Sequence, residues 1–149
     1  MDHDRKAESA AMILSSRERA FVTRQRIGHL ATVNASGSPS VVPVCFVLDD
    51  DTLYTALDEK PKRTRHLRRI RDLRENSRVA FTADCYDEDW SRLGWVMIRG
   101  QGDILESGKE FERGCELLRV RYAQYATMTL SPVIAVRLLE ARSWGNLDG

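Results

Sequence analysis

The alternation of apolar and polar positions predicts short strands interrupted by three helices. Apolar residues set among charged ones indicate helices over residues 7–25, 64–75 and 107–122. Between and after them, β-branched and aromatic runs bounded by turn-forming residues are typical of strands. These six segments are residues 27–33, 40–48, 52–57, 78–85, 94–105 and 133–139.

The order of these segments predicts the fold class. Three strands follow the first helix without a helix between them, so the β-α-β alternation of a doubly wound sheet is missing, and we expect an antiparallel meander. Pro43, inside the second strand, indicates a sheet edge, a bulge or a place where a ligand interrupts pairing. Gly100 and Gly102 predict a bend in the fifth strand. We therefore expect one mainly β domain over residues 1–149, a six-stranded antiparallel split β-barrel with flanking helices and with Trp144 at its end.

Composition excludes several classes of protein. The chain of 149 residues is 42% hydrophobic and 30% charged with a net charge of +1, which gives it no general attraction to nucleic acid or to membranes. Its first residues are too polar for a signal peptide, and no apolar run approaches the ~20 residues that span a bilayer. The three cysteines are widely spaced, which indicates neither a disulfide framework nor a zinc site. We expect a cytoplasmic protein that binds neither nucleic acid nor membrane.

The junction after the third strand is the strongest candidate for ligand binding. Residues 54–67 pass from an apolar strand through a cationic loop into a helix, where free N–H groups and the helix dipole favour an anion. Lys60, Lys62 and Arg63 can add charge-assisted hydrogen bonds to a phosphate. Neither a G-x-x-x-x-G-K-[ST] loop nor a G-x-G-x-x-G motif is present. A solvated basic loop without a ligand is the competing interpretation.

The chain lacks the residue patterns of protein-borne catalysis. It has no triad signature and no H-E-x-x-H motif, and its three histidines lie far apart. We interpret His29 as structural and expect tryptophans to pack in the core or at a dimer interface unless a ligand claims them. A hydride-transfer enzyme needs no such catalytic set, because its cofactor carries the reaction.

In their order and spacing, four segments resemble the pyridoxamine 5′-phosphate oxidase-like superfamily of split barrels, and in particular its F420-dependent branch. These segments are Leu30–Phe46, Leu53–Arg63, Arg78–Ala80 and Tyr86–Leu93. The resemblance covers nearly the whole chain. It implies a homodimer with a cofactor in a groove between the subunits, and an enzyme that transfers hydride to a small molecule.

The resemblance also implies roles for particular residues. Lys60, Lys62 and Arg63 match the positions that hold the cofactor phosphate, and Thr55 and Ala56 match positions that line the same end of the cofactor. The strand formed by Val42, Pro43 and Val44 matches the backbone that runs beside the tricyclic ring, and Trp95 matches a position that closes the site. No catalytic side chain and no metal ligand is implied.

Charge favours the deazaflavin F420 over FMN. F420 carries an acidic glutamyl tail beyond its phosphate, and residues 60–78 contain nine Lys and Arg that can extend the basic track. Alternatively, these arginines pair with the acidic loop 84–89 or face solvent. Ser40 and Cys45 stand where true pyridoxamine phosphate oxidases have basic residues, which argues against that substrate. We expect F420-dependent reduction of a quinone, enone or tetrapyrrole-like acceptor, with an FMN-binding oxidase-like protein or a non-catalytic flavin or haem carrier as alternatives.

Overall fold

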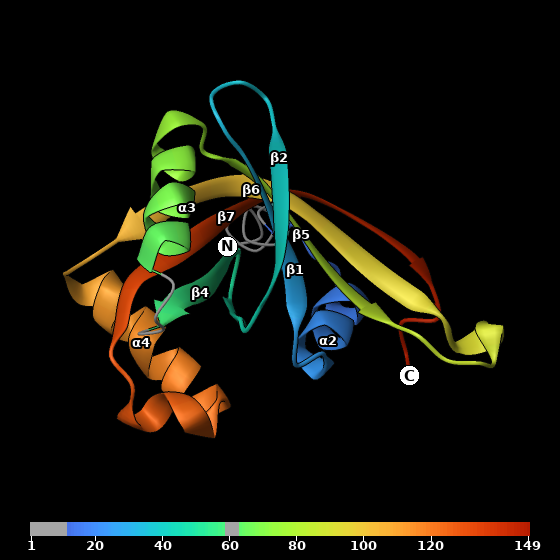
Figure 1. Ribbon diagram of the computed structural model, residues 1–149. Helices are drawn as coiled ribbons and strands as arrows, with labels where there is room; N and C mark the ends of the chain where they lie inside the picture. Colours follow the sequence, from blue (N-terminus) through green and yellow to red (C-terminus); the bar gives the residue numbers. More distant parts are fainter. Residues whose placement is uncertain (1–11, 59–62) are drawn as a thin grey trace, which may run out of the picture.

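A single antiparallel sheet of seven strands organises the computed structural model, which describes residues 12–58 and 63–149, with the backbone alone for residues 57, 58 and 63–67 (Figure 1). The strand order is β2-β1-β5-β6-β7-β4-β3. The strands are β1 (Gly28–Val33), β2 (Pro39–Val44), β3 (Val47–Asp49), β4 (Thr52–Asp58), β5 (Arg78–Cys85), β6 (Gly94–Leu105) and β7 (Leu130–Gly145). The helices are α2 (Ser16–Arg24), α3 (Arg63–Glu75) and α4 (Lys109–Arg121), with short 3₁₀ turns η1 (Trp90–Arg92) and η2 (Ala123–Thr127).

The predicted mainly β antiparallel architecture is confirmed, but the predicted number of six strands is wrong. The segment expected as one strand over residues 40–48 is two strands, because β2 pairs with β1 while β3 pairs with β4. The first strands therefore do not form a simple meander. Instead β1 also pairs with β5, and β4 also pairs with β7, so β2 and β3 lie at opposite ends of the strand order.

The last strand is longer than predicted. We expected residues 133–139, whereas β7 covers Leu130–Gly145 and pairs with β6 along almost its whole length. Its first half has four consecutive buried residues from Val133, and its last residues are mostly exposed. Neither half alternates between apolar and polar positions, so the pattern on which the prediction relied is absent.

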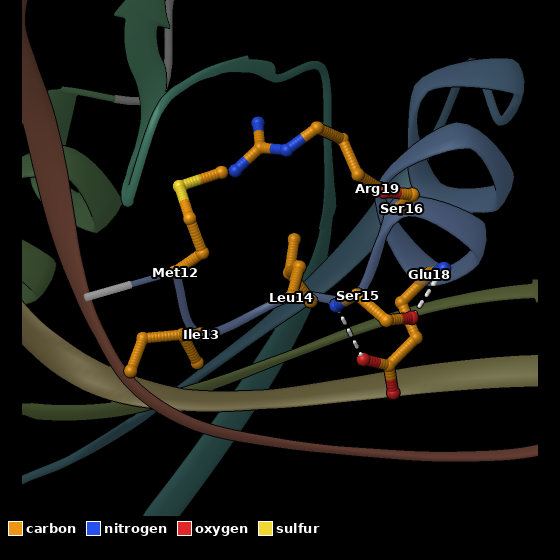
Figure 2. Close-up of a pocket in the computed structure, with 7 residues that line it drawn as sticks. All are labelled: Met12, Ile13, Leu14, Ser15, Ser16, Glu18 and Arg19. Carbon is orange, nitrogen blue, oxygen red and sulfur yellow. Dashed lines mark hydrogen bonds between the residues drawn. The ribbon is translucent and has the colours of Figure 1, made fainter. Parts of the chain in front are cut away.

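The first helix begins later than predicted. The prediction started at residue 7, but residues 12–15 are not helical and residues 7–11 lie outside the described part of the chain. A capping box fixes the start, since Ser15 Oγ accepts a hydrogen bond from the Glu18 N–H (3.1 Å) and the Ser15 N–H donates to Glu18 Oε1 (2.9 Å). Figure 2 shows both bonds at the first turn of α2.

The main core fills the inner face of the sheet. Phe46 and Phe81 are fully buried and meet edge to face at 4.8 Å between ring centroids. Phe21 of α2 and Leu73 of α3 join this core. A second core lies between α4 and the other face of β4 and β7, where Leu118 is fully buried, and Figure 1 shows α4 alongside these strands.

A glycine makes the curvature of the sheet possible. Strand β6 has a bulge against β7 between Arg99 and Gly100, as the sequence predicted for Gly100. A Cβ atom at Gly100 would lie 2.4 Å from the Arg137 carbonyl oxygen, so a larger residue does not fit there. At Gly102 the absent side chain leaves room for Leu73 of α3, whose Cδ2 would be 3.0 Å from such a Cβ.

Arginines at the C-terminal ends of helices α2 and α4 connect these two ends. Arg121, the last residue of α4, donates to the carbonyl of Gln25, the C-cap of α2, and Arg26 Nη2 donates to the Arg121 carbonyl (2.7 Å). Both guanidinium groups also lie over the ring of Tyr122. Helix C-termini carry unpaired carbonyls and partial negative charge, so each helix end receives the cation it needs from the other.

A charged network fastens α4 to the sheet. Glu110 accepts from Arg137 Nη2 (2.8 Å) and from the Tyr54 hydroxyl (2.8 Å), and Arg137 Nε donates to Asp103 (2.9 Å). The bonds from Arg137, with a smaller contribution from Tyr54, lower the pKa of Glu110 to about 2. Burial and the bond to Glu110 raise the pKa of Tyr54 to about 12. The network is therefore intact as long as Glu110 is ionised.

This network predicts an acid-dependent contribution to stability. Because the pKa of Glu110 is lowered on folding, its contribution is complete above the ordinary glutamate value of 4.5 and is lost as pH falls toward 2. We expect Glu110→Gln to lower the free energy of unfolding at pH 7, and the difference from the wild type to shrink between pH 4.5 and 2. Urea unfolding at several pH values measures this. Glu112→Gln, at an exposed position of the same helix, is the control and should behave as the wild type. A constant difference at all pH values would contradict this role.

Candidate functional site at the split of the sheet

The two ends of the sheet meet where the chain leaves β2 and enters β3. Only Cys45 and Phe46 lie between these strands, although β2 and β3 are at opposite ends of the strand order. Among the described residues, the outer edge of β2 has no strand paired to it. We call the region where the end of β2 adjoins β4 the split.

Side chains satisfy the backbone of this crossing. Thr55 Oγ1 donates to the Cys45 carbonyl (2.7 Å). The Phe46 N–H donates to the Tyr122 hydroxyl (3.0 Å), whose oxygen lies 2.9 Å from the Phe46 carbonyl oxygen. A buried backbone group without a partner is costly, so these two side chains allow the chain to leave one strand pair and join another.

The free edge of β2 presents a defined set of backbone groups. A proline in a paired strand must turn its nitrogen away from the ladder, so the Pro43 carbonyl faces the free edge. Because peptide groups alternate along a strand, the N–H and the carbonyl of Val41 face the same way. The Cys45 carbonyl, two residues beyond Pro43, points to Thr55 across the split, in agreement with this phase. Of the three alternatives that the sequence left open for Pro43, a sheet edge, a bulge or a ligand interrupting pairing, the structure shows the sheet edge.

Two groups of predicted site residues meet at the split. Val42 and Val44 are half-buried on the core side of β2, opposite Leu30 and Gly28, and Pro43 is on the outer side. On β4, Thr55 is buried and Ala56 is half-buried. The bond from Thr55 to Cys45 joins the end of β2 to β4. The predicted phosphate loop follows β4 directly.

The structure describes little of that loop. Arg63 is the first residue of α3, with its backbone alone described. Lys60 and Lys62 lie outside the described residues. The predicted cradle at the start of α3 therefore stays a prediction.

Trp95 does not join the other predicted residues within one chain. It lies on β6, with β5 and β1 between it and β2, which is roughly 14 Å at the usual inter-strand spacing. Trp144 of β7 is directly opposite Trp95, and the two side chains are 36% and 54% exposed. This pair was not predicted, because the final strand expected from the sequence stopped at residue 139.

Trp95 belongs to a broad surface of the sheet that we call the open face. Cross-strand partners share a face, so the ladder register identifies its members. Its apolar or neutral members are exposed or half-exposed: His29, Ala31, Val41, Pro43, Ala80, Thr82, Trp95, Met97 and Trp144. The same register also places the charged residues Arg78, Asp84, Arg99, Glu140 and Arg142 on this face. Val41 is 65% exposed. Contiguous apolar surface of this kind often marks an interaction site.

Three cavities on the described surface lie away from the split: one at the start of α2, one across β5, β6 and β7, and one between α3 and β6. A cavity of about 500 Å³ lies between Met12, the first turn of α2 and Arg19, and Figure 2 shows the side chains of Met12 and Arg19 approaching each other beside it. Arg19 Nη2 donates to the Asp50 carbonyl (2.6 Å) in the turn between β3 and β4. This cavity contains none of the predicted site residues, so we assign it no part in the site.

The described residues show neither a cluster of metal ligands nor a membrane-spanning helix. No group of three or more His, Cys, Asp or Glu side chains there is arranged to hold a metal ion. Within the same residues, no helix is both long and apolar enough to cross a bilayer.

The fold and the split define a flavin-type split barrel, and comparison with known families agrees. The family model for pyridoxamine 5′-phosphate oxidase matches residues 14–145, and the chain belongs to this family of oxidoreductases. A 5a,11a-dehydrotetracycline/5a,11a-dehydrooxytetracycline reductase from Streptomyces rimosus is 30% identical over 122 residues, covering 78% of this chain and 83% of the reductase. The resemblance to this superfamily that we noted from the sequence is thereby confirmed.

Solved structures share the fold at low sequence identity. A 5-nitroimidazole antibiotic resistance protein from Bacteroides thetaiotaomicron, described as putative, aligns with a TM-score of 0.68 at 16% identity, covering 87% of this chain and 82% of that protein. The haem storage protein HutZ from Vibrio cholerae aligns with a TM-score of 0.68 at 15% identity, covering 90% and 95%. The predicted split barrel is confirmed, with seven strands in place of six.

The crossing between β2 and β3 predicts a specific effect of substitution at Thr55. Thr55→Val keeps the shape of the buried side chain but leaves the Cys45 carbonyl without its donor, so we expect a loss of about 1–3 kcal/mol in the free energy of unfolding. Thr55→Ser keeps the hydroxyl and is the matched control. Urea denaturation compares the two variants. If Thr55→Val proves as stable as Thr55→Ser, the hydrogen bond does not hold the crossing.

Proposed function

We propose that this protein is an F420-dependent oxidoreductase that passes hydride from the reduced deazaflavin to a planar organic acceptor. Membership of the pyridoxamine 5′-phosphate oxidase family supports redox chemistry on a tricyclic cofactor. The observation that carries the proposal is the free edge of β2. The residue that follows β2, Cys45, is hydrogen-bonded to Thr55 of β4, and the basic loop follows β4 in the chain. When bound, the deazaflavin supplies a hydride.

The residues at the split fit such a cofactor. The N–H and carbonyl of Val41 offer a donor and an acceptor, which complement one carbonyl and the adjacent N–H of a pyrimidinedione ring, and the carbonyl of Pro43 is a further acceptor on the same edge. Val42 and Val44 give the edge an apolar side, and Thr55 and Ala56 line the adjoining end of β4. Lys60, Lys62 and Arg63 would hold the phosphate.

The charge on α3 favours F420 over FMN. Arg68 and Arg71 are exposed and form no ion pair with any described residue, and Arg74 pairs with Glu106 at 3.1 Å. Two carboxylates of the acidic loop 84–89, which could have paired with these arginines, have other partners: Asp87 lies 3.9 Å from Arg92, and Asp89 accepts from the Ser91 N–H. Free cations beyond the phosphate loop suit an acidic tail, which FMN lacks.

The related reductase supports the choice of acceptor. Its name describes reduction of a 5a,11a double bond in a tetracycline, which is a planar, oxygen-rich polycycle. We infer that this chain reduces a conjugated enone or quinone of similar shape. Haem-storing proteins share the fold, so a non-catalytic carrier is the alternative that the binding experiment below also tests.

We further propose that the protein is a homodimer joined through the open face. Its apolar residues, Val41 and Trp144 among them, are exposed in the single chain, and a second copy would cover them. In one chain Trp95 is three strands from the β2 edge, so a role for Trp95 in closing the site is simplest if it acts on the site of the partner.

Binding affinities test the cofactor assignment. We expect apoprotein fluorescence titrations to give tighter binding of F420 than of FMN or haem, with a gap between F420 and FMN that narrows as salt screens the tail. Lys60→Ala with Lys62→Ala should weaken F420 binding by about 1.5–3 kcal/mol for each charge-assisted bond lost. Lys109→Ala, at an exposed position on α4, is the control. Equal affinities at low salt would favour FMN, and an unchanged affinity of the double variant would exclude the cradle.

Oligomeric state tests the interface. We expect sedimentation to show a dimer that Val41→Glu dissociates, because a buried carboxylate without a partner is costly. Val120→Glu, on α4 and 82% exposed, should leave the dimer intact.

Mixed dimers test whether Trp95 acts on the partner. Co-expressed with the Lys60→Ala, Lys62→Ala variant, Trp95→Ala should restore about a quarter of the F420 sites, because each mixed dimer then has one intact site. No restored sites would mean that each chain uses its own Trp95.

A further inference from the structure

The open face has one titratable side chain close to the β2 edge, His29. On β1, His29 lies directly opposite Pro43 of β2 and Thr82 of β5, and its side chain is exposed. The register therefore puts it on the strand next to the free edge, on the outer side. The sequence analysis interpreted this histidine as structural, but an exposed imidazole on a sheet face does not pack in the core.

His29 has no partner that would explain it structurally. It forms no hydrogen bond or ion pair with any described residue. Its neighbours on the open face are neutral, namely Ala31 on its own strand, Val41 and Pro43 on β2, and Ala80 and Thr82 on β5. The nearest charged groups on that face are Asp84 on β5, Arg99 on β6 and Arg142 on β7. No described residue therefore occupies the imidazole nitrogens.

The reaction proposed above needs a proton as well as a hydride. Hydride addition to the β-carbon of an enone breaks the carbon–carbon double bond and leaves an enolate, which must gain a proton to give the saturated ketone. The reduced deazaflavin is the hydride donor and becomes oxidised. An imidazolium is a suited donor of the proton, because imidazole groups titrate near neutral pH, and solvent restores the proton afterwards.

We propose that His29 is the general acid of this reduction, delivering its proton to an acceptor that lies over the outer side of β1 and β2. This inference rests on the proposed function: a ring along the outer edge of β2 lies about two strand spacings, ~10 Å, from the His29 strand, so the acceptor stacked on the ring would extend over the outer side of β2 to meet the imidazole. Among described residues, Thr82 and Met97 of the same row cannot supply a proton at neutral pH, and Asp84 is a carboxylate.

Kinetics with menadione and with 5a,11a-dehydrotetracycline test the assignment. We expect His29→Asn to lower kcat about 100-fold or more with either acceptor and to leave the Kd for F420 within about two-fold. The pH profile of kcat should differ between the wild type and His29→Asn. Imidazole added to His29→Gly should restore part of the rate. Val120→Ala, on α4 and 82% exposed, is the control and should keep wild-type kinetics.

A second measurement does not depend on turnover. The chain has three histidines, so ¹⁵N-imidazole NMR can assign His29 by comparison with His29→Asn. In the dead-end complex with oxidised F420, added menadione should shift the His29 resonances and leave the dimer intact.

The outcomes separate this inference from the proposed function. Wild-type kcat in His29→Asn, no rescue by imidazole, or dissociation of the variant into monomers would overturn the role of His29 while F420-dependent reduction stands. Failure of the wild type to bind F420, or to reduce either acceptor, would overturn both.

Discussion

The architecture depends on how the chain crosses from β2 to β3. At Cys45 and Phe46 the backbone leaves one strand pair and enters another, so its polar groups cannot be satisfied by a continuous ladder. Thr55 and Tyr122 supply the missing partners, and the Phe46 ring fills the core beneath them. Without these contacts, residues 39–49 would satisfy more of their backbone hydrogen bonds by continuing as one strand. The crossing thus opens the sheet and joins the β2 edge to the end of β4.

Much of the fold could be predicted from local pattern. β1, β5 and β6 were found nearly to their ends, because each has one face on the core and one exposed, and Pro43 correctly indicated an edge. The break within residues 40–48 could not be predicted, since both halves are apolar and the cause lies in side chains outside the segment: Thr55 on the next strand pair and Tyr122, which is 76 residues from Phe46. The ends of β7 were not predicted for a related reason. The length of β7 depends on its pairing with β6 and not on an alternation of apolar and polar residues in its own sequence.

The parts of the candidate site that consist of residues adjacent in sequence could be predicted. The motifs on β2 and β4 were found from residues adjacent in sequence, and the structure joins them at the split. Trp144 and His29 were not, because their positions depend on register: Trp144 is a neighbour of Trp95 only when β7 is in place, and the side on which His29 lies follows from its pairing with Pro43. The pattern within one strand does not reveal what lies across it.

An unpaired strand edge is a hazard for most proteins, since it can template the addition of a foreign strand and begin aggregation. On β2 the outward-facing nitrogens belong to residues 39, 41 and 43, and two of these are prolines. The edge therefore keeps its carbonyls but only one amide hydrogen. A flat heterocycle can form hydrogen bonds with these few backbone groups. Another polypeptide strand cannot pair along the edge, because it would need amide hydrogens that the two prolines lack. The same prolines therefore permit a small molecule to bind at the edge and prevent a strand from adding to it.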